Sequence, residues 1–460
     1  MWSLTDPATA STMARVWILG LVLSMQIAAA SAPAPEAERQ PGSELRVFLL
    51  TLGPGDAAWE KFGHNALMIR DESAGTDVAY NWGIFQFDNW FIFNFIRGRL
   101  WYWMEGEDAA SMIHWYIQVQ DRSVWLQELN LSPAQRLALR DLCQWNALPE
   151  HRRYKYDYYI DNCSTRVRDA LDRVLDGQIK RAAQQIPSPI TYRSETRRLM
   201  ADDPILYTAV YFILGQRIDR KLTAWDEMFI PMRMKDRFNE LSVVDEQGNA
   251  QPLVQRELLL HASRRSPPRQ DPPNWIGWFL LFGSTWGGIM VVCSLRMPSG
   301  SDANAQTSRR AYPWAKWGLG VSAGLWSILC GFAGCFLLYG WFLTDHTWTQ
   351  DNENLLQLNP LLLPLVVLAP MQLRGSRRAG RAALVLAAAG LTGSLAGMIL
   401  QVLPMMDQVN GEMIALALPA NAGLAAALLI LSKHQGISAG ATTRELERAG
   451  SSKRTKGGSS

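Results

Sequence analysis

Five long apolar runs in the C-terminal part of the chain limit its fold more than any other feature. A helix needs about 20 mainly apolar residues to cross the hydrocarbon core of a bilayer, and each run meets or nearly meets that length. The sequence therefore predicts an all-α transmembrane domain over residues 274–432. Its five predicted helices span residues 275–295, 317–343, 355–373, 382–404 and 413–431.

The loops between these runs alternate in charge. Arginine and lysine gather after the first run, after the third run and in the C-terminal tail, whereas the other two loops are acidic or neutral. Basic loops stay on the cytoplasmic side of a membrane. We therefore expect a cytoplasmic C-terminus, and an outer side shared by the loop at residues 344–354 and the N-terminal part of the chain.

The N-terminus carries an export signal pattern. Arg15 precedes an apolar core from Val16 to Ile27, and Ala28-Ala29-Ala30 follows. This order is typical of a secretory signal peptide, so we predict a signal over residues 1–30 that is cleaved near Ala30. A retained N-terminal anchor is the alternative. Export agrees with the loop charges, and both predict a multi-pass protein of a bacterial inner membrane with its soluble domain in the periplasm.

Residues 36–262 have the composition of a soluble α+β domain. Strand-like runs at 44–52, 64–70 and 78–85 are separated by turn signals. Helical patterns begin after Ser132 and at about Cys163. Residues 263–273 form a proline-rich linker. Residues 433–460 are rich in serine, glycine and charge, which predicts a disordered cytoplasmic tail.

Cys163 lies at a position that favours a nucleophilic thiolate. Cys163 begins a predicted helix that Asn162 can cap. Unpaired N–H groups and the helix dipole at this position stabilise a thiolate and so lower the cysteine pKa. A nucleophilic thiolate needs a base and an orienting group, for which His64 and Asn81 are the candidates. Asn162 and the Cys163 N–H are candidate oxyanion donors. The alternative is that all three residues are structural. Cys163 would then pack in the core, His64 would be an ordinary strand residue and Asn81 would belong to a turn.

Composition argues against cofactors and nucleic acid. The five cysteines show no CxxC pair and no metal-ligand spacing with histidine, so no metal or other cofactor is expected. A net charge of +3, without a basic stripe, does not indicate a nucleic-acid partner. An exported chain could join Cys143 to Cys163 in a disulfide, but the position of Cys163 favours a free thiol.

Several motifs resemble a known family. FGHNALMIRD (62–71), YNWGIFQFD (80–88), NFIRGRLWYWM (94–104), YDYYIDNCSTRVRDAL (156–171) and TDHTWTQDNENLLQLNPL (344–361) resemble the Lnb family of bacterial lipoprotein N-acyltransferases. The resemblance covers nearly the whole mature chain. It implies a membrane-bound acyltransferase that moves an acyl chain from a phospholipid, through a cysteine thioester, to the N-terminal amine of a lipoprotein.

The order of a histidine strand before a cysteine helix is also similar to permuted papain-like enzymes of the NlpC type. That likeness implies an α+β papain-like (permuted NlpC-like) fold, with Cys163 as nucleophile and His64 as base. Asn81 is the third member, with Asp88 behind it. The alternatives are a cysteine hydrolase of the envelope, either an NlpC-like peptidase or a phospholipase, and a non-enzymatic scaffold. A hydrolase turns over with water alone, whereas the thioester of an acyltransferase persists until an amine acceptor reacts with it.

Five further polar residues are candidates for substrate binding. Polar side chains where a span enters the membrane are costly and often functional, and an arginine near the site could bind a phosphate. The alternative is that they cap the third span or lie on a solvated helix face. These residues are Arg166, His346, Asn352, Asn354 and Asn359.

Overall fold

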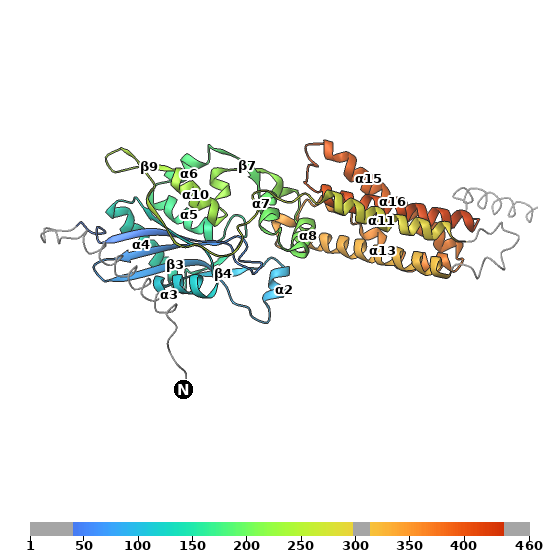
Figure 1. Ribbon diagram of the computed structural model, residues 1–460, viewed down its shortest axis with the longest axis horizontal. Coiled ribbons are helices and arrows are strands. Elements are labelled where there is room, and N and C mark those ends of the chain that lie inside the picture. The colour runs from blue at the N-terminus through green and yellow to red at the C-terminus, as the bar shows by residue number, and fades with distance from the viewer. Residues whose placement is uncertain (1–39, 298–312, 437–460) are drawn as a thin grey trace, which may run out of the picture.

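The computed structural model describes residues 40–297 and 313–436, which form an α/β part and a helical part placed end to end (Figure 1). The predicted signal peptide with its cleavage near Ala30 lies outside the described residues. So do Arg309 and Arg310 of the first basic loop and most of the predicted tail. The α/β part comes first in the chain, and the helical part contains the candidate membrane spans.

A seven-stranded antiparallel sheet forms the centre of the soluble domain. Its order is β11-β5-β1-β2-β3-β4-β6. The strand-like runs predicted at 64–70 and 78–85 form the antiparallel hairpin of β2 and β3. The strands are β1 (Leu45–Leu52), β2 (His64–Asp71), β3 (Thr76–Ile84), β4 (Trp101–Asp108), β5 (Val124–Leu129), β6 (Arg153–Lys155) and β11 (Val254–His261).

Both faces of the sheet are covered because side chains alternate along each strand. In β1, Val47 and Leu49 face one core, while Phe48 and Leu50 face the other. Helices α4 (Pro133–Ala147), α5 (Cys163–Val174) and α10 (Pro231–Glu240) cover the first face. Helix α3 (Ala109–His114) and the π-helical turn η1 (Trp115–Val119) cover the second.

Residues 178–230 are mostly helical and face the membrane part. A small aromatic core around Tyr159, Tyr192 and Phe229 holds this segment to the domain. The remaining elements are α2 (Phe91–Ile96), α6 (Gln178–Ala183), β7 (Pro187–Thr191), α7 (Tyr192–Leu199), α8 (Pro204–Ile213), η2 (Gln216–Asp219), β8 (Lys221–Thr223), α9 (Ala224–Glu227), β9 (Ser242–Val244) and β10 (Ala250–Pro252).

Among the described residues, four helices are long and apolar enough to cross a membrane: α11 (Ile276–Leu295), α13 (Pro313–Phe342), α15 (Arg377–Ile399) with its extension to Val402, and α16 (Gly411–His434). The third predicted run is not one straight helix. It forms the 3-10 turns η4 (Glu353–Leu356) and η5 (Pro360–Leu362) and then α14 (Leu365–Leu373), with a bend of 48°. Pro360 and Pro364 lack the N–H groups that a continuous helix needs.

Helices α11 and α16 pack so closely that glycine is required. A Cβ on Gly287 would lie 2.5 Å from the Pro419 carbonyl oxygen, and one on Gly423 would overlap the Gly287 Cα. Small residues allow this approach between membrane helices. Gly287→Val should therefore destabilise the bundle by about 1–3 kcal/mol, the usual cost of overpacking. Thermal unfolding in detergent measures this cost. Gly288→Val is the matched control, since the described residues leave open space there; equal losses would contradict the packing argument.

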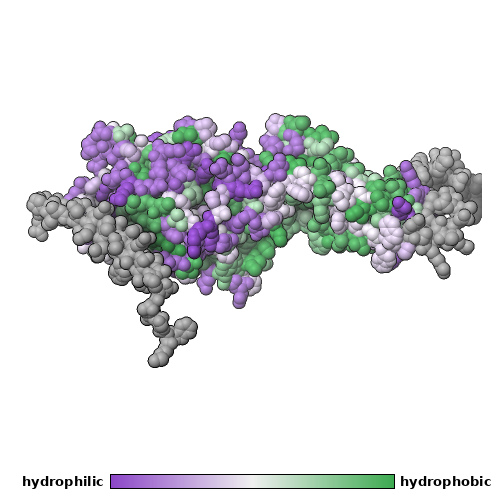
Figure 2. Space-filling model, viewed as in Figure 1, coloured by the Kyte–Doolittle hydropathy of each residue, from purple (hydrophilic) through white to green (hydrophobic). Residues whose placement is uncertain are grey.

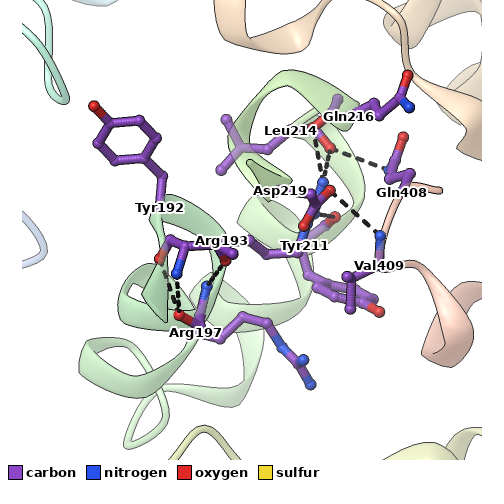
Figure 3. A network of polar contacts seen from close by, with 12 residues as sticks. Tyr192, Arg193, Arg197, Tyr211, Leu214, Gln216, Asp219, Gln408 and Val409 are labelled. Atoms are coloured by element: carbon purple, nitrogen blue, oxygen red, sulfur yellow. Dashed lines mark hydrogen bonds and ion pairs between the residues drawn. The ribbon is translucent and has the colours of Figure 1, made fainter. Parts of the chain in front are cut away.

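The soluble domain is fastened to the ends of the membrane helices by a polar network (Figure 3). Arg193 binds Asp219 at 2.7 Å, and the other Asp219 oxygen accepts the Val409 N–H at 3.3 Å. The Gly215 N–H donates to the Trp348 carbonyl at 2.8 Å. These contacts place the loops at 344–354 and 405–410 on the side of the soluble domain, as the loop charges predict.

The proline-rich linker is held against the soluble domain and is not a free tether. Arg265 near its start pairs with Asp56. Near its end, Arg197 donates to the Pro273 carbonyl at 2.9 Å and binds Glu412 at the start of α16 at 2.6 Å. The linker therefore runs along the domain and delivers the chain to α11 beside α16.

Candidate active site

Helix α5 begins at Cys163 because Asn162 caps it. The Asn162 side-chain oxygen accepts the N–H groups of Ser164 and Thr165, both at 2.9 Å. Its Nδ2 donates to the carbonyls of Tyr158 and Phe229, both at 3.0 Å. The predicted capping role is confirmed. Both amide hydrogens of this side chain already have carbonyl partners, so the predicted oxyanion role would require one of these hydrogen bonds to break.

The Cys163 thiol is free and lies at the ends of β2 and β3. Ser164 Oγ is 2.8 Å from the side-chain oxygen of Asn65, the residue after His64. Gly83, the residue before the last one of β3, lies at a bulge with φ +92°, and a Cβ there would lie 3.4 Å from the Cys163 Cβ. A left-handed glycine therefore lets the nucleophile candidate approach the strand ends.

His64 is held by a chain of hydrogen bonds that fixes its tautomer. Asn81 Nδ2 donates to Glu107 Oε1 at 2.7 Å, which leaves Asn81 Oδ1 to face His64 Nε2 at 3.0 Å. An amide oxygen only accepts, so Nε2 must carry the proton. The lone pair of the neutral ring is therefore on Nδ1, which can accept a proton. Asn81 thus lies where an orienting group for His64 is expected.

Asp88, predicted to stand behind Asn81, lies elsewhere. Its carboxylate accepts the Trp90 N–H at 2.9 Å and closes the turn before α2. Glu107 on β4 takes the expected position because β4 pairs with β3, bringing Glu107 beside Asn81. The sequence offers no local signal for Glu107, since the pairing of β3 with β4 is what joins the two residues.

Burial controls the charges of the two central groups. It lowers the pKa of His64 to about 4, assisted by the nearby Arg122 guanidinium and opposed by the Asn81 hydrogen bond. Burial also raises the pKa of the Cys163 thiol, despite the opposing N–H groups of Asn65 and Ser164 and the Arg122 charge. The expectation that the helix terminus lowers this pKa is wrong because desolvation outweighs it. The resting pair is therefore neutral thiol and neutral imidazole.

This pKa of His64 predicts a pH-dependent stability. Between pH 6.5 and 4 the unfolded chain binds a proton at His64 that the folded chain does not, so the free energy of unfolding falls as pH falls. Between about pH 7 and about pH 5 the loss should be about 2 kcal/mol. Denaturant titrations of the full chain in detergent should show that His64→Gln removes this part of the pH dependence. An unchanged slope would contradict the assigned pKa.

Two buried polar groups near the thiol have no hydrogen-bond partner among the described residues: Nη2 of Arg122 and the hydroxyl of Tyr154. Arg122 donates through Nε to the Gly53 carbonyl at 2.6 Å and lies over the Tyr116 ring, which stacks on His64. The Tyr154 hydroxyl would lie 4.0 Å from a Cβ on Gly83. A buried polar group without a partner costs about 1–3 kcal/mol, so such groups call for a functional explanation.

Sequence patterns do not reveal either group. Arg122 precedes an apolar strand, and Tyr154 belongs to a tyrosine-rich run with no distinctive spacing. Within residues 40–297 and 313–436, no group of three or more His, Cys, Asp or Glu side chains is arranged to hold a metal ion.

The residues predicted to bind substrate make structural contacts. Asn352 and Asn354 are buried and donate to carbonyls at the end of α8. Asn359 caps η5, and His346 Nε2 lies 2.7 Å from the Phe95 carbonyl oxygen. Arg166 is paired with Asp161 and stacks on the Tyr154 ring at 4.1 Å. The first four thus join the outer loop to the soluble domain or shape its turns, and Arg166 packs beside the site with its charge already paired.

The fold and the site indicate the general class of this protein. It is a membrane protein whose α/β domain holds a candidate cysteine–histidine site and is followed by a helical bundle. Residues 35–198 match the family model described as the Lnb N-terminal periplasmic domain. This match and the four apolar helices of the described residues support an Lnb-type membrane protein with a periplasmic domain. No curated protein and no solved structure gives a significant match.

Proposed function

We propose that this protein is a thiol-dependent acyltransferase of the inner membrane, which moves an acyl chain from phospholipid to the N-terminal amine of a lipoprotein. The observation that carries the proposal is the Glu107–Asn81–His64 chain, which leaves a neutral imidazole with its lone pair on Nδ1. The thiol of Cys163 is free, and the N–H of Asn65, the residue after His64, acts on its pKa. The match of residues 35–198 to the Lnb N-terminal periplasmic domain supports the choice of substrates.

The first half-reaction forms a thioester. Cys163 Sγ attacks the carbonyl carbon of a phospholipid ester while His64 Nδ1 takes the thiol proton. The negative oxygen of the tetrahedral intermediate accepts hydrogen bonds, for which the Cys163 N–H and the Tyr154 hydroxyl are the candidates. The intermediate then collapses by breaking the ester C–O bond. The lysophospholipid leaves with the proton from His64, and the acyl chain remains on Cys163.

The second half-reaction forms an amide. A neutral amine attacks the thioester carbonyl, and His64 Nδ1 takes a proton from the amine nitrogen. The C–S bond breaks, and the thiolate recovers the proton from His64. Both Cys163 and His64 are only partly exposed, which supports transfer over hydrolysis, since a thioester that water reaches poorly survives until an amine arrives.

The order of the elements supports the same chemistry. The strand with His64 precedes the helix with Cys163, and Asn81 lies on the strand next to His64. Permuted papain-like enzymes use this order and these roles, so we assign the domain to that superfamily as part of the proposal.

Intact-mass spectrometry of the full chain in detergent with phospholipid tests the proposal, with Cys163→Ser beside it. The wild type should gain the mass of one acyl chain, which hydroxylamine removes and a diacylated lipopeptide discharges. Release of free fatty acid without an amine acceptor would support a phospholipase instead. No adduct and no lipid turnover would refute both lipid reactions and favour a peptidase or a scaffold.

Tyr154→Phe separates the oxyanion role from a packing role. It removes the hydroxyl but keeps the ring on which Arg166 stacks. Thioester formation should slow about 100- to 1,000-fold, while stability stays equal or rises because a buried unpaired hydroxyl is gone. Tyr159→Phe is the control: its hydroxyl lies 2.8 Å from Thr196 Oγ1, so stability should fall and the rate should persist. A wild-type rate in Tyr154→Phe would exclude the hydroxyl as a donor.

A further inference from the structure

Helix α2 displays an unusually exposed apolar surface. Ile92 is 71% exposed, Trp90 65% and Phe93 49%, and Phe95 and Ile96 are also exposed. The helix is short and carries almost no polar residues on this side. Large exposed apolar patches mark interaction sites. Figure 2 shows apolar residues gathered on the lower edge of the soluble domain, at the end toward the helical part, where Figure 1 draws α2.

The patch is tied to the outer end of a membrane helix. The Asp345 N–H donates to the Arg97 carbonyl at 2.9 Å, and His346 Nε2 lies 2.7 Å from the Phe95 carbonyl oxygen. Gly98, at φ +73°, permits this approach, because a Cβ there would lie 2.8 Å from the His346 nitrogen. Residues 345–346 follow directly on the outer end of α13, whose last residues are strongly exposed and apolar.

The inner side of α2 leads to the candidate active site through stacked aromatic rings. Phe91 stacks on Phe85 with ring centroids 5.4 Å apart, and Phe85 stacks on Tyr102 at 4.9 Å. Tyr102 stacks on Tyr156 at 4.2 Å. Tyr156 is buried close enough to Cys163 for a thiolate there to raise its pKa. Aromatic side chains therefore connect the exposed patch to the surroundings of the thiol.

We propose that α2 lies in the outer interface of the bilayer that the membrane helices span, with its exposed side in contact with phospholipid acyl chains. Continuity with the lipid-facing end of α13 fixes this occupant, because a patch tied to the end of a membrane helix meets the same lipid. Aromatic and apolar side chains at this depth favour the boundary between headgroups and acyl chains. The proposal does not depend on the chemistry of Cys163. If that chemistry holds, α2 sets the site beside its lipid substrate.

Photolabelling from within the bilayer tests the proposal on the full chain. The protein is reconstituted in vesicles of phosphatidylethanolamine and phosphatidylglycerol that contain a phospholipid with a diazirine in its acyl chain. After illumination, peptides covering residues 89–97 should be labelled, as should peptides from α11. Val244 of β9 is also exposed and apolar, at 46%, but it belongs to a hairpin of the soluble domain, so its peptide should remain unlabelled.

A single substitution makes the result specific. Ile92→Glu places a charge at the most exposed position of α2 and should lower labelling of residues 89–97 about tenfold, with α11 unchanged. Val244→Glu should change neither. Labelled α11 with unlabelled α2 in the wild type would overturn the proposal and assign the patch to a protein partner. Labelling of α2 that Ile92→Glu leaves unchanged would also overturn it, because the exposed side would then not face lipid.

Discussion

Replacing His64 with glutamine should slow formation of the Cys163 thioester about 100- to 10,000-fold, the usual contribution of a general base. The reason lies in the charges of the resting site. Because burial raises the pKa of Cys163, few molecules carry a thiolate at neutral pH, and the attack depends on a base that takes the proton as the bond forms. A quenched time course of intact mass with phospholipid measures the rate.

The pH dependence of the remaining rate shows whether His64 acts as the base. In the wild type the rate should change little above about pH 5, since the pKa of His64 is about 4. In His64→Gln it should rise about tenfold per pH unit toward the pKa of the thiol, because solvent must now remove the proton. His151→Gln is the control, since His151 stacks on Trp145 away from the site. A wild-type rate and pH profile in His64→Gln would contradict the mechanism.

The parts of the fold that were predicted from the sequence are those set by local patterns. Turn residues between two strand-like runs fix the hairpin of β2 and β3. A cap residue before an apolar stripe fixes the starts of α4 and α5, where Ser132 and Asn162 each accept the expected N–H groups. The broken third span was not predicted because its apolar composition satisfies the length rule for a membrane helix, whereas Pro360 and Pro364 interrupt its backbone hydrogen bonds.

The residues of the candidate site also fall into two groups, those that local motifs indicate and those that only the fold brings together. Cys163, His64 and Asn81 lie in short recognisable motifs, and the structure links His64 to Asn81 and sets both near the cysteine helix. Glu107 and Arg122 belong to the site only because distant segments fold against it, so no spacing in the sequence indicates them. The direction of the Cys163 pKa also depends on the fold. A helix terminus is visible in the sequence, but the burial that outweighs it is not.

The free-energy cost of placing polar residues at a membrane surface does not by itself identify a binding site, as the asparagines of the loop at residues 344–354 show. Buried polar residues at a membrane surface need a reason, and substrate binding is one. Asn352 and Asn354 instead satisfy carbonyls at the end of α8, where a helix terminus always leaves acceptors without partners. The polar residues at this boundary therefore fasten the soluble domain to the membrane helices. The contribution of these contacts to stability can be measured by substituting one of them.

Arg193→Met should lower the free energy of unfolding by about 3–5 kcal/mol, because it leaves a buried carboxylate without its partner. The side chains of Arg193 and Asp219 are 2% and 6% exposed. The guanidinium also donates to the carbonyls of Tyr211, Leu214 and Gly215, and methionine can replace none of these bonds. Chemical denaturation of the full chain in detergent measures the loss.

Arg217→Met is the matched control, because it breaks a pair of the same type in solvent. Arg217 and Asp351 are 2.7 Å apart, with side chains 46% and 43% exposed, and exposed pairs contribute only about 0–1 kcal/mol. Adding Asp219→Asn to Arg193→Met should recover part of the loss, since it removes the uncompensated charge. Equal losses of unfolding free energy for Arg193→Met and Arg217→Met would show that burial does not determine how much these ion pairs contribute to stability. A larger loss at Arg193, partly recovered in the double variant, would identify the unpaired carboxylate as the cause.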